Sequence, residues 1–321
     1  MSDADRRGMP DDGEAGAFFR PSERAHLHPC TQVELLDRVS AIVLSRPGLF
    51  FGLGALSALP GFVMLLVLAV VPSAAGAGAA EPGMAEALIM LMAWLLEEWP
   101  VAAIVACGFQ AFLLPQRELR LWVAMQTVLG RMAAFAGTRM FAWAVVLGLM
   151  LFVVATGSGA GGPLSNLLAL PALVVALVML VLWSLAGPVI LFERRSFVRA
   201  LARSSELMRG RFAGGRLADS PFSRLLLVLA FPAAVFALEQ VIVQAMGFRL
   251  PGGSYPNMNP SPGFALASGI VLFVGQTLRA PFLYVGIAMI YAECRMRREA
   301  FDLRVRMMDG PDAATNPDLV G

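Results

Sequence analysis

The sequence predicts an all-α integral membrane protein with six transmembrane helices. Of the 321 residues, 58% are hydrophobic and only 15% are charged, whereas a soluble domain has about 45–50% apolar and about 25% charged residues. Six runs of roughly 20 apolar residues follow one another, and each is long enough to cross a bilayer as a helix. Because the bilayer core offers no water to the backbone, spanning segments satisfy their hydrogen bonds internally as helices.

The six apolar runs pair into three helical hairpins. The predicted spans are 49–71, 88–114, 141–156, 165–191, 225–247 and 264–291. The connection inside each hairpin is rich in turn-forming residues. We expect the membrane domain to cover 32–306. The segments 1–31 and 307–321 are polar and rich in Pro, Gly and acidic residues, which predicts disordered cytoplasmic tails.

Arginine is distributed very unevenly between the two sides of the predicted membrane domain. All 25 basic residues are arginine, and 23 of them lie in the two terminal segments and in the two connections between hairpins. Cytoplasmic segments of membrane proteins carry the excess of basic residues, so both termini are expected in the cytoplasm. The net charge of only +2 excludes a strongly basic nucleic-acid-binding protein as the function class.

A short basic segment precedes each hairpin and repeats the pattern Leu-x-Arg followed eight residues later by Arg. In the third segment, Phe197, Leu201, Met208 and Phe212 fall on one helical face, which is typical of a helix lying in the headgroup layer with its apolar side toward the bilayer. Any juxtamembrane helix in an arginine-only protein would show a similar pattern. We define the predicted arginine collar, expected to contact headgroups or a partner, as Arg38, Arg46, Arg131, Arg139, Arg195, Arg199, Arg203, Arg211, Arg295, Arg297 and Arg298.

Two charged residues fall deep inside the last two spans. Glu239 lies about 21 Å and Arg279 about 18 Å above the same ends of their helices, counted at 1.5 Å per residue, so they share one height in the hairpin. Charges at this depth need partners. We predict a Glu239–Arg279 ion pair, with Gln240, Gln244 and Gln276 taking up further hydrogen bonds. A structural clamp and a transport or proton-relay site are both consistent with such a pair.

Glu97 and Glu98 are the other acidic residues within an apolar run. If the second span starts at residue 88, both carboxylates lie about 14–15 Å inside it. In the alternative, 85–96 form an outer interfacial helix, and the span proper begins near Trp99 with Pro100 in its first turn. We prefer the second version slightly.

The motifs of common catalytic and metal sites are missing from the sequence. There is no Walker motif, no HExxH and no CxxC. The two histidines, His26 and His28, lie beside Cys30 in the N-terminal tail, and structural zinc needs four ligands. We therefore expect no enzymatic activity, no metal and no cofactor, and three reduced cysteines.

Three stretches resemble a known family. Residues 291–303 (YAECRMRREAFDL), 193–212 with Glu193 and Ala-Leu-Ala-Arg-Ser, and 34–38 (ELLDR) resemble bacterial proteins similar to the membrane domain of glycerophosphoryl diester phosphodiesterase. Ala300, Glu293 and Ser205 depart from that family's pattern. The resemblance implies a six-helix architecture in a bacterial inner membrane. The family's catalytic activity lies in a separate soluble barrel, and nothing here resembles that barrel.

These observations favour a non-catalytic, multi-pass inner-membrane protein. Its arginine collar is expected to bind anionic phospholipids or a partner protein, because each basic residue near an anionic surface contributes about 1 kcal/mol. No nucleic-acid partner is expected. The alternative is a small transporter or channel with an intramembrane site at Glu239 and Arg279.

Overall fold

The computed structural model of the chain describes residues 30–75, 84–113, 121–157, 163–209, 220–249 and 262–299. Within these ranges every regular element is a helix, and six helices are long and apolar enough to cross a membrane. This confirms the predicted all-α class of a multi-pass membrane protein. The predicted tail 307–321 lies outside the described residues, as does 1–31 apart from its last two residues.

Each of the three pairs of long helices follows a short helix. The described helices are α1 (Gln32–Ser45), α2 (Pro47–Ala75), α3 (Met84–Leu113), α4 (Leu121–Leu129), α5 (Met132–Gly157), α6 (Pro163–Trp183), α7 (Ala186–Glu193), α8 (Phe197–Arg209), α9 (Pro221–Arg249) and α10 (Pro262–Glu299). In this order α1 precedes the α2–α3 hairpin, α4 precedes the α5–α6 hairpin, and α8 precedes the α9–α10 hairpin.

Local sequence signals place the helix starts. Four of the long helices begin with proline, at Pro47, Pro163, Pro221 and Pro262. Proline suits a first helical turn because the N–H that it lacks would have no intrahelical partner there. Helix α1 starts instead with a capping box. The Thr31 hydroxyl accepts a hydrogen bond from the Glu34 N–H, and the Glu34 carboxylate accepts one from the Thr31 N–H.

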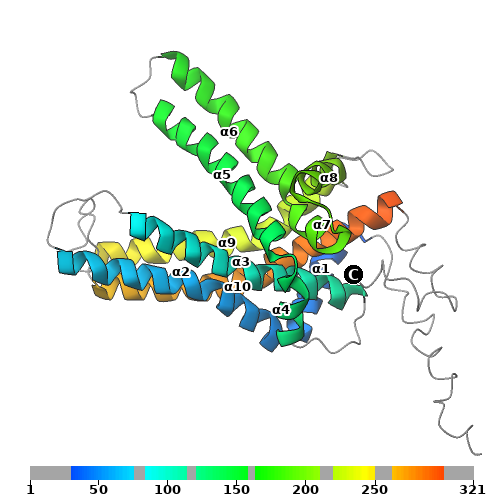
Figure 1. Cartoon of the computed structure of the whole chain (residues 1–321), viewed down its shortest axis with the longest axis horizontal. Coiled ribbons are helices and arrows are strands. Elements are labelled where there is room, and N and C mark those ends of the chain that lie inside the picture. Colours follow the sequence, from blue (N-terminus) through cyan, green and yellow to red (C-terminus); the bar gives the residue numbers. More distant parts are fainter. Residues whose placement is uncertain are drawn as a thin grey trace, which may run out of the picture.

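The long helices form two arms that meet at one end (Figure 1). The bundle arm consists of α2, α3, α9 and α10, and α10 packs against each of the other three. The hairpin arm consists of α5 and α6, which pack on each other and diverge from the bundle arm. We call the region where the arms meet the junction; it contains α1, α4, α7 and α8 with the adjoining ends of the long helices.

Small residues let the helices of the bundle arm approach closely. A Cβ atom on Gly54 of α2 would lie 2.6 Å from the Thr277 carbonyl oxygen of α10, and a Cβ on Gly286 of α10 would collide with Val228 of α9. Close backbone approach at small residues is the usual way in which membrane helices gain packing energy, since lipid tails are as apolar as leucine.

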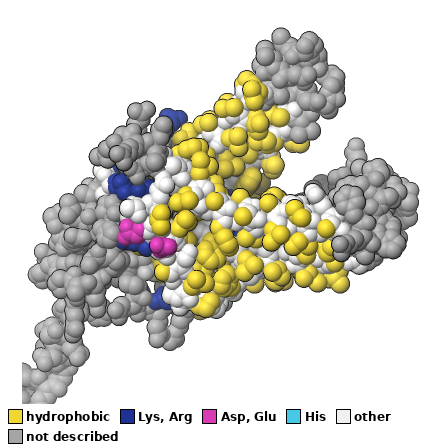
Figure 2. All heavy atoms as spheres, turned by 180° about the vertical axis from the view of Figure 1, so that it is seen from behind, with side chains coloured by type: hydrophobic (Ala, Val, Ile, Leu, Met, Phe, Trp, Pro, Cys, Tyr) yellow, Lys and Arg dark blue, Asp and Glu magenta, His cyan; other side chains and the backbone are white. Residues whose placement is uncertain are grey.

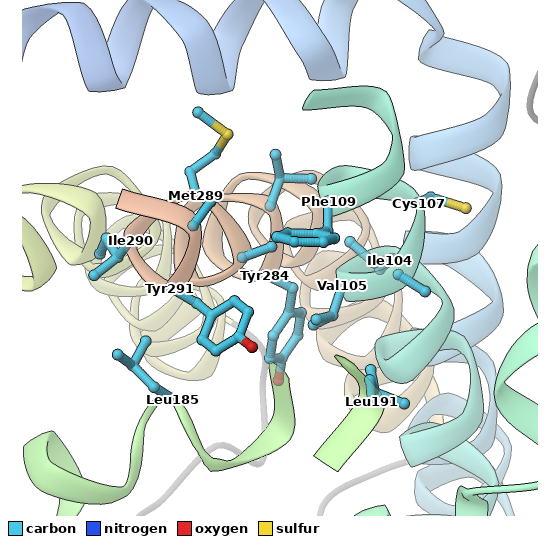
Figure 3. Packing of buried hydrophobic residues seen from close by; sticks show 14 of the residues in the cluster. Ile104, Val105, Cys107, Phe109, Leu185, Leu191, Tyr284, Met289, Ile290 and Tyr291 are labelled. Atoms are coloured by element: carbon cyan, nitrogen blue, oxygen red, sulfur yellow. The ribbon is translucent and has the colours of Figure 1, made fainter. Parts of the chain in front are cut away.

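Among the described residues, many of the largest fully buried side chains lie in the junction. Figure 3 shows Tyr284 and Tyr291 projecting from α10 on one side, toward the segment that carries Leu185 and Leu191, and all four are buried. Tyr291 stacks with Phe192 at 5.8 Å between ring centroids. The arms, in contrast, carry apolar side chains on their outer surfaces (Figure 2), as expected of helices whose surroundings are lipid.

The third and fourth spans differ from their predicted limits. The third begins at Met132, nine residues before the predicted start at 141. The fourth is interrupted by a turn at Ser184 and Leu185, between α6 and α7. Ser204 of α8 holds this turn: its hydroxyl donates to the Leu182 carbonyl at 2.6 Å and accepts from the Leu185 N–H at 3.1 Å.

The second span is one continuous helix. Helix α3 runs from Met84 to Leu113 with Pro100 inside it, so the predicted break between an outer helix over 85–96 and a span beginning near Trp99 is wrong. The Trp99 indole N–H donates to the Met125 carbonyl of α4 at 3.1 Å. This contact places Trp99 beside α4 rather than at the start of a helix.

Helix α8 does not present its apolar face to a bilayer. Leu201 and Met208, expected on a lipid-facing side, are buried together with Leu207, and α8 packs on α6, α7, α9 and α10. Phe197 meets the ring of Phe141 edge-on at 5.1 Å, and Phe212 lies outside the described residues. Packing this apolar face against protein removes it from water just as contact with lipid would.

The repeated arginine pattern does not keep its register in three dimensions. Arg38 lies inside α1, whereas Arg131 lies in the break between α4 and α5. Arg46 caps α1, whereas Arg139 lies two turns inside α5. The order of a short helix followed by a hairpin recurs, but the arginines occupy different structural positions because the helix breaks fall at different places.

Candidate functional site

The predicted partners Glu239 and Arg279 form an ion pair between α9 and α10. The Glu239 side chain is 5% exposed and the Arg279 side chain is 21% exposed. The guanidinium also lies 5.4 Å from the centre of the Phe236 ring, within cation–π range. Gly275 faces this pair, because a Cβ atom there would collide with the Glu239 carboxylate. Gly275 and Phe236 thus pack directly against the pair.

The predicted glutamine partners behave differently from one another. Gln276 donates to Glu97 of α3 at 3.2 Å rather than to Glu239. Among the described residues, neither Gln240 nor Gln244 hydrogen-bonds to the pair, and Gln244 is exposed. The helix face that holds Arg279 therefore also binds α3, which is a connection that the sequence did not suggest.

A second charged pair, not predicted, joins α3 to α5. Arg139 lies 2.9 Å from the Glu98 carboxylate and donates to the Tyr284 hydroxyl of α10 at 3.1 Å. Its guanidinium lies 5.2 Å from the centre of the Tyr284 ring. The Glu98 side chain is only 2% exposed. Arg139, expected in the collar as a headgroup contact, is instead an internal residue that connects three hairpins.

A cavity of about 260 Å³ lies where the two arms diverge, and we call it the fork cavity. Its walls come from α3, α5, α6, α7, α9 and α10 and are mainly apolar. Arg139 and Tyr284 line it, together with Trp143 and Trp183. Glu239 and Arg279 are not among its lining residues. Glu239 and Arg279 thus form a packed ion pair within the bundle arm. Arg139, which pairs with Glu98, instead borders the cavity.

A third polar cluster lies in the junction and is almost fully enclosed. The Glu293 carboxylate accepts from the Cys30 thiol at 2.7 Å, and it pairs with Arg224 at 3.0 Å and Arg297 at 2.6 Å. Both arginines donate to the Cys30 carbonyl at 2.9 Å. Arg224 is 0% and Glu293 1% exposed. The cluster ties the start of α1 to both helices of the last hairpin.

Cys30 was expected in a mobile tail, but it is buried in this cluster. Burial, and then its hydrogen bond to Glu293, raises the pKa of the Cys30 thiol to about 12. A thiol with such a pKa stays protonated at neutral pH and is a poor nucleophile or metal ligand. Cys107 and Cys294 are also free and buried. His26 and His28 lie outside the described residues.

Glu193, at the end of α7, organises a fourth cluster. It accepts from the Tyr291 hydroxyl at 3.1 Å and pairs with Arg195 at 2.9 Å and Arg203 at 3.3 Å. Arg203 also pairs with Glu206 at 3.0 Å. These contacts join α7, α8 and α10, so two collar arginines serve internal pairing as well as any outward contact.

The remaining collar residues divide into paired, half-buried and exposed groups. Arg38 pairs with Glu34 inside α1, and Arg297 belongs to the Glu293 cluster. Arg199 is exposed. Arg211 lies outside the described residues. The half-buried members are Arg46, Arg131, Arg295 and Arg298; of these, Arg298 donates to the Glu206 carbonyl of α8.

The exposed arginines form a basic patch that is smaller than the predicted arginine collar. Arg194, Arg199 and Arg209 are exposed at the ends and on the outer face of α8, and no described residue forms an ion pair with them. Burial, and then the charge of Arg194, lower the pKa of Arg131. We define the basic patch as Arg131, Arg194, Arg199 and Arg209. Exposed guanidinium groups without a carboxylate partner favour an anion.

Sequence reasoning missed Glu98, Arg139 and Tyr284 as a group because they come from three hairpins, whose packing order has no local signal. A signal for Cys30 did exist: Thr31 and Glu34 form a capping-box pattern, which places Cys30 directly before an ordered helix. The break in the fourth span also had a signal, since Gly187 and Pro188 are weak helix residues.

The fold and these clusters define a multi-pass helical membrane protein with an apolar cavity and a basic patch near the junction. Comparison of the chain with protein-family models, with curated proteins and with solved structures finds no match.

Proposed function

We propose that the protein is a non-catalytic, lipid-binding membrane protein of the bacterial inner membrane that engages anionic headgroups through the basic patch. The carrying observation is the exposure of Arg194, Arg199 and Arg209 without ion pairs to described residues, in a molecule whose other described arginines are largely held in internal contacts. Unpaired guanidinium groups beside apolar helices fit phosphate groups at a bilayer surface.

The position of the basic patch supports this proposal. Helix α8 sits where the apolar arms end, so arginines on its outer face lie at the edge of the apolar surface. The charge of Arg194 disfavours the charged form of Arg131, and a phosphate bound at the patch would relieve that repulsion. The patch faces the cytoplasm if the distribution of arginines follows the positive-inside rule.

The proposal is tested by thermal unfolding of the purified full chain in detergent with added phosphatidylglycerol or phosphatidylcholine. We expect the anionic lipid to raise the Tm of the wild type by a few degrees more than the zwitterionic lipid. In the double variant Arg194→Gln with Arg199→Gln, most of this difference should disappear, because each arginine near an anionic surface contributes about 1 kcal/mol.

The matched control is Arg249→Gln, which removes the same type of charge. Arg249 is the last residue of α9, at the end of that helix that lies away from the junction. It should leave the preference for phosphatidylglycerol unchanged. If the double variant keeps the full preference, or if the wild type has none, the basic patch does not bind anionic headgroups.

A further inference from the structure

The fork cavity lies between two arms whose outer surfaces are apolar. Leu147 and Val174 of the hairpin arm and Leu226 of the bundle arm are exposed, and the spans to which they belong are apolar enough to cross a membrane. The lining of the cavity is mainly apolar, and a buried water needs two to four polar partners. Hydrocarbon is therefore the medium that suits this space.

The charges beside the cavity compensate each other. Arg139 is neutralised by Glu98 at 2.9 Å, so the site offers no excess positive charge to a carboxylate or phosphate. An anion bound by Arg139 would compete with Glu98 and leave that carboxylate buried without its cation, which is costly. The ligand group that best fits this position is polar but uncharged.

Tyr284 supplies the matching donor. Its hydroxyl oxygen accepts from Arg139 at 3.1 Å, and its own proton has no acceptor among the described residues. The other two hydroxyls in the lining already donate to backbone carbonyls, Thr138 to Ala134 at 2.7 Å and Ser184 to Val181 at 2.8 Å. A hydroxyl that accepts from a cation is polarised into a stronger donor.

We propose that the fork cavity holds one acyl chain of a bilayer phospholipid and that Tyr284 donates a hydrogen bond to the ester carbonyl of that chain. Its volume of about 260 Å³ is slightly below the roughly 300–1,000 Å³ of typical small-molecule sites, so it accommodates part of a lipid, with the headgroup outside. This inference rests on the proposed lipid-binding function and adds the binding site and the chemical group that it recognises.

Native mass spectrometry of the full chain tests the site by counting bound lipids during titration in detergent. The probe is dioleoyl phosphatidylcholine, which is zwitterionic and so does not depend on the basic patch. We expect Ala142→Phe to weaken the first binding event, because Ala142 lines the cavity. The matched control is Ala144→Phe two residues along α5, where the side chain is exposed and outside the lining.

The hydrogen bond is tested with the dialkyl ether counterpart of the same lipid, which lacks the ester carbonyl. The wild type should bind the ester lipid roughly two- to tenfold more tightly than the ether lipid, the range expected for one hydrogen bond. In Tyr284→Phe this preference should vanish. Because it compares two lipids on one protein, this test holds even if Ala142→Phe does not fold.

The proposal is overturned if Ala142→Phe and Ala144→Phe bind the probe equally, or if the wild type does not distinguish ester from ether lipid. It is also overturned if light scattering shows a dimer that Ala142→Phe separates, since a second copy would then fill the fork. Loss of the phosphatidylglycerol preference in the Arg194 and Arg199 variant, with these results intact, would concern the basic patch alone.

Discussion

In the junction the large side chains are enclosed by protein, whereas in the arms most of them face outward. Leu185 and Leu207 of the junction are 0% exposed, while Leu147 and Leu151 of the hairpin arm are 54% and 68% exposed. The difference reflects the surroundings: helices in lipid gain little from covering apolar surface, so the arms need few mutual contacts. Buried polar clusters, which demand complete pairing, are accordingly concentrated at and near the junction.

The two ion pairs of the apolar region show the same contrast on a smaller scale. Glu239 and Arg279 belong to consecutive helices of one arm and are locked by Gly275 and Phe236. Both residues lie outside the lining of the fork cavity. Arg139 instead borders the cavity and joins the hairpin arm to the bundle arm through Glu98 and Tyr284. The position of Tyr284 in the cavity is therefore tied to how the two arms are placed.

The largest effect is expected from breaking the junction cluster. In Glu293→Gln, the fully buried Arg224 loses its carboxylate, and we expect a loss of about 3–5 kcal/mol in the free energy of unfolding, as for other broken buried pairs. Chemical denaturation in detergent measures it. The control Glu206→Gln removes a carboxylate whose side chain is 65% exposed and should have little effect. Equal losses in the two variants would show that the cluster does not stabilise the junction.

The sequence predicts features that are set within one helix or one hairpin, but not contacts that depend on how separate hairpins pack. Six spans follow from local hydropathy, and the Glu239–Arg279 pair follows from counting heights within one hairpin. The contacts of Arg139 with Glu98 and Tyr284 depend on how three hairpins pack, and every long helix has a similar all-round apolar composition. Nothing local therefore distinguishes the inward-facing side of α5 from the side that faces lipid.

The burial of α8 was unpredictable for a related reason. An amphipathic helix buries its apolar face equally well against lipid or against protein, so Leu201 and Met208 are compatible with both positions. Ser204 decides between them in the structure, because its hydroxyl holds the turn between α6 and α7. A buried serine on an apolar helix face is a useful sign of protein contact, since an unpaired hydroxyl in hydrocarbon is unfavourable.

A smaller loss of stability is expected when the pH is raised, and it tests whether the junction encloses Cys30. The pKa of Cys30 is raised from its ordinary value of 9.0 to about 12 in the folded protein. Its contribution to stability is therefore complete below pH 9 and is lost as pH rises toward 12, because only the unfolded thiol ionises in that range. The wild type should lose up to about 1.4 kcal/mol per pH unit relative to Cys30→Ala.

Parallel denaturation curves at pH 8 and pH 10.5 for the wild type and Cys30→Ala measure this difference. Other ionising groups are common to both proteins and cancel in the comparison. If the two proteins lose stability equally over this range, Cys30 is exposed to solvent and the junction does not enclose it.

The smallest effect is expected in the hairpin arm, and it tests whether that arm faces lipid. Leu147 is 54% exposed on α5, so Leu147→Ala should change the free energy of unfolding by less than about 0.5 kcal/mol, as for surface substitutions. The matched change Leu185→Ala in the junction should cost about 2–5 kcal/mol. Denaturation in lipid-containing micelles measures both. A cost at Leu147 close to that at Leu185 would mean that protein, rather than lipid, covers this side of the arm, because replacing a leucine that touches only hydrocarbon leaves no cavity behind.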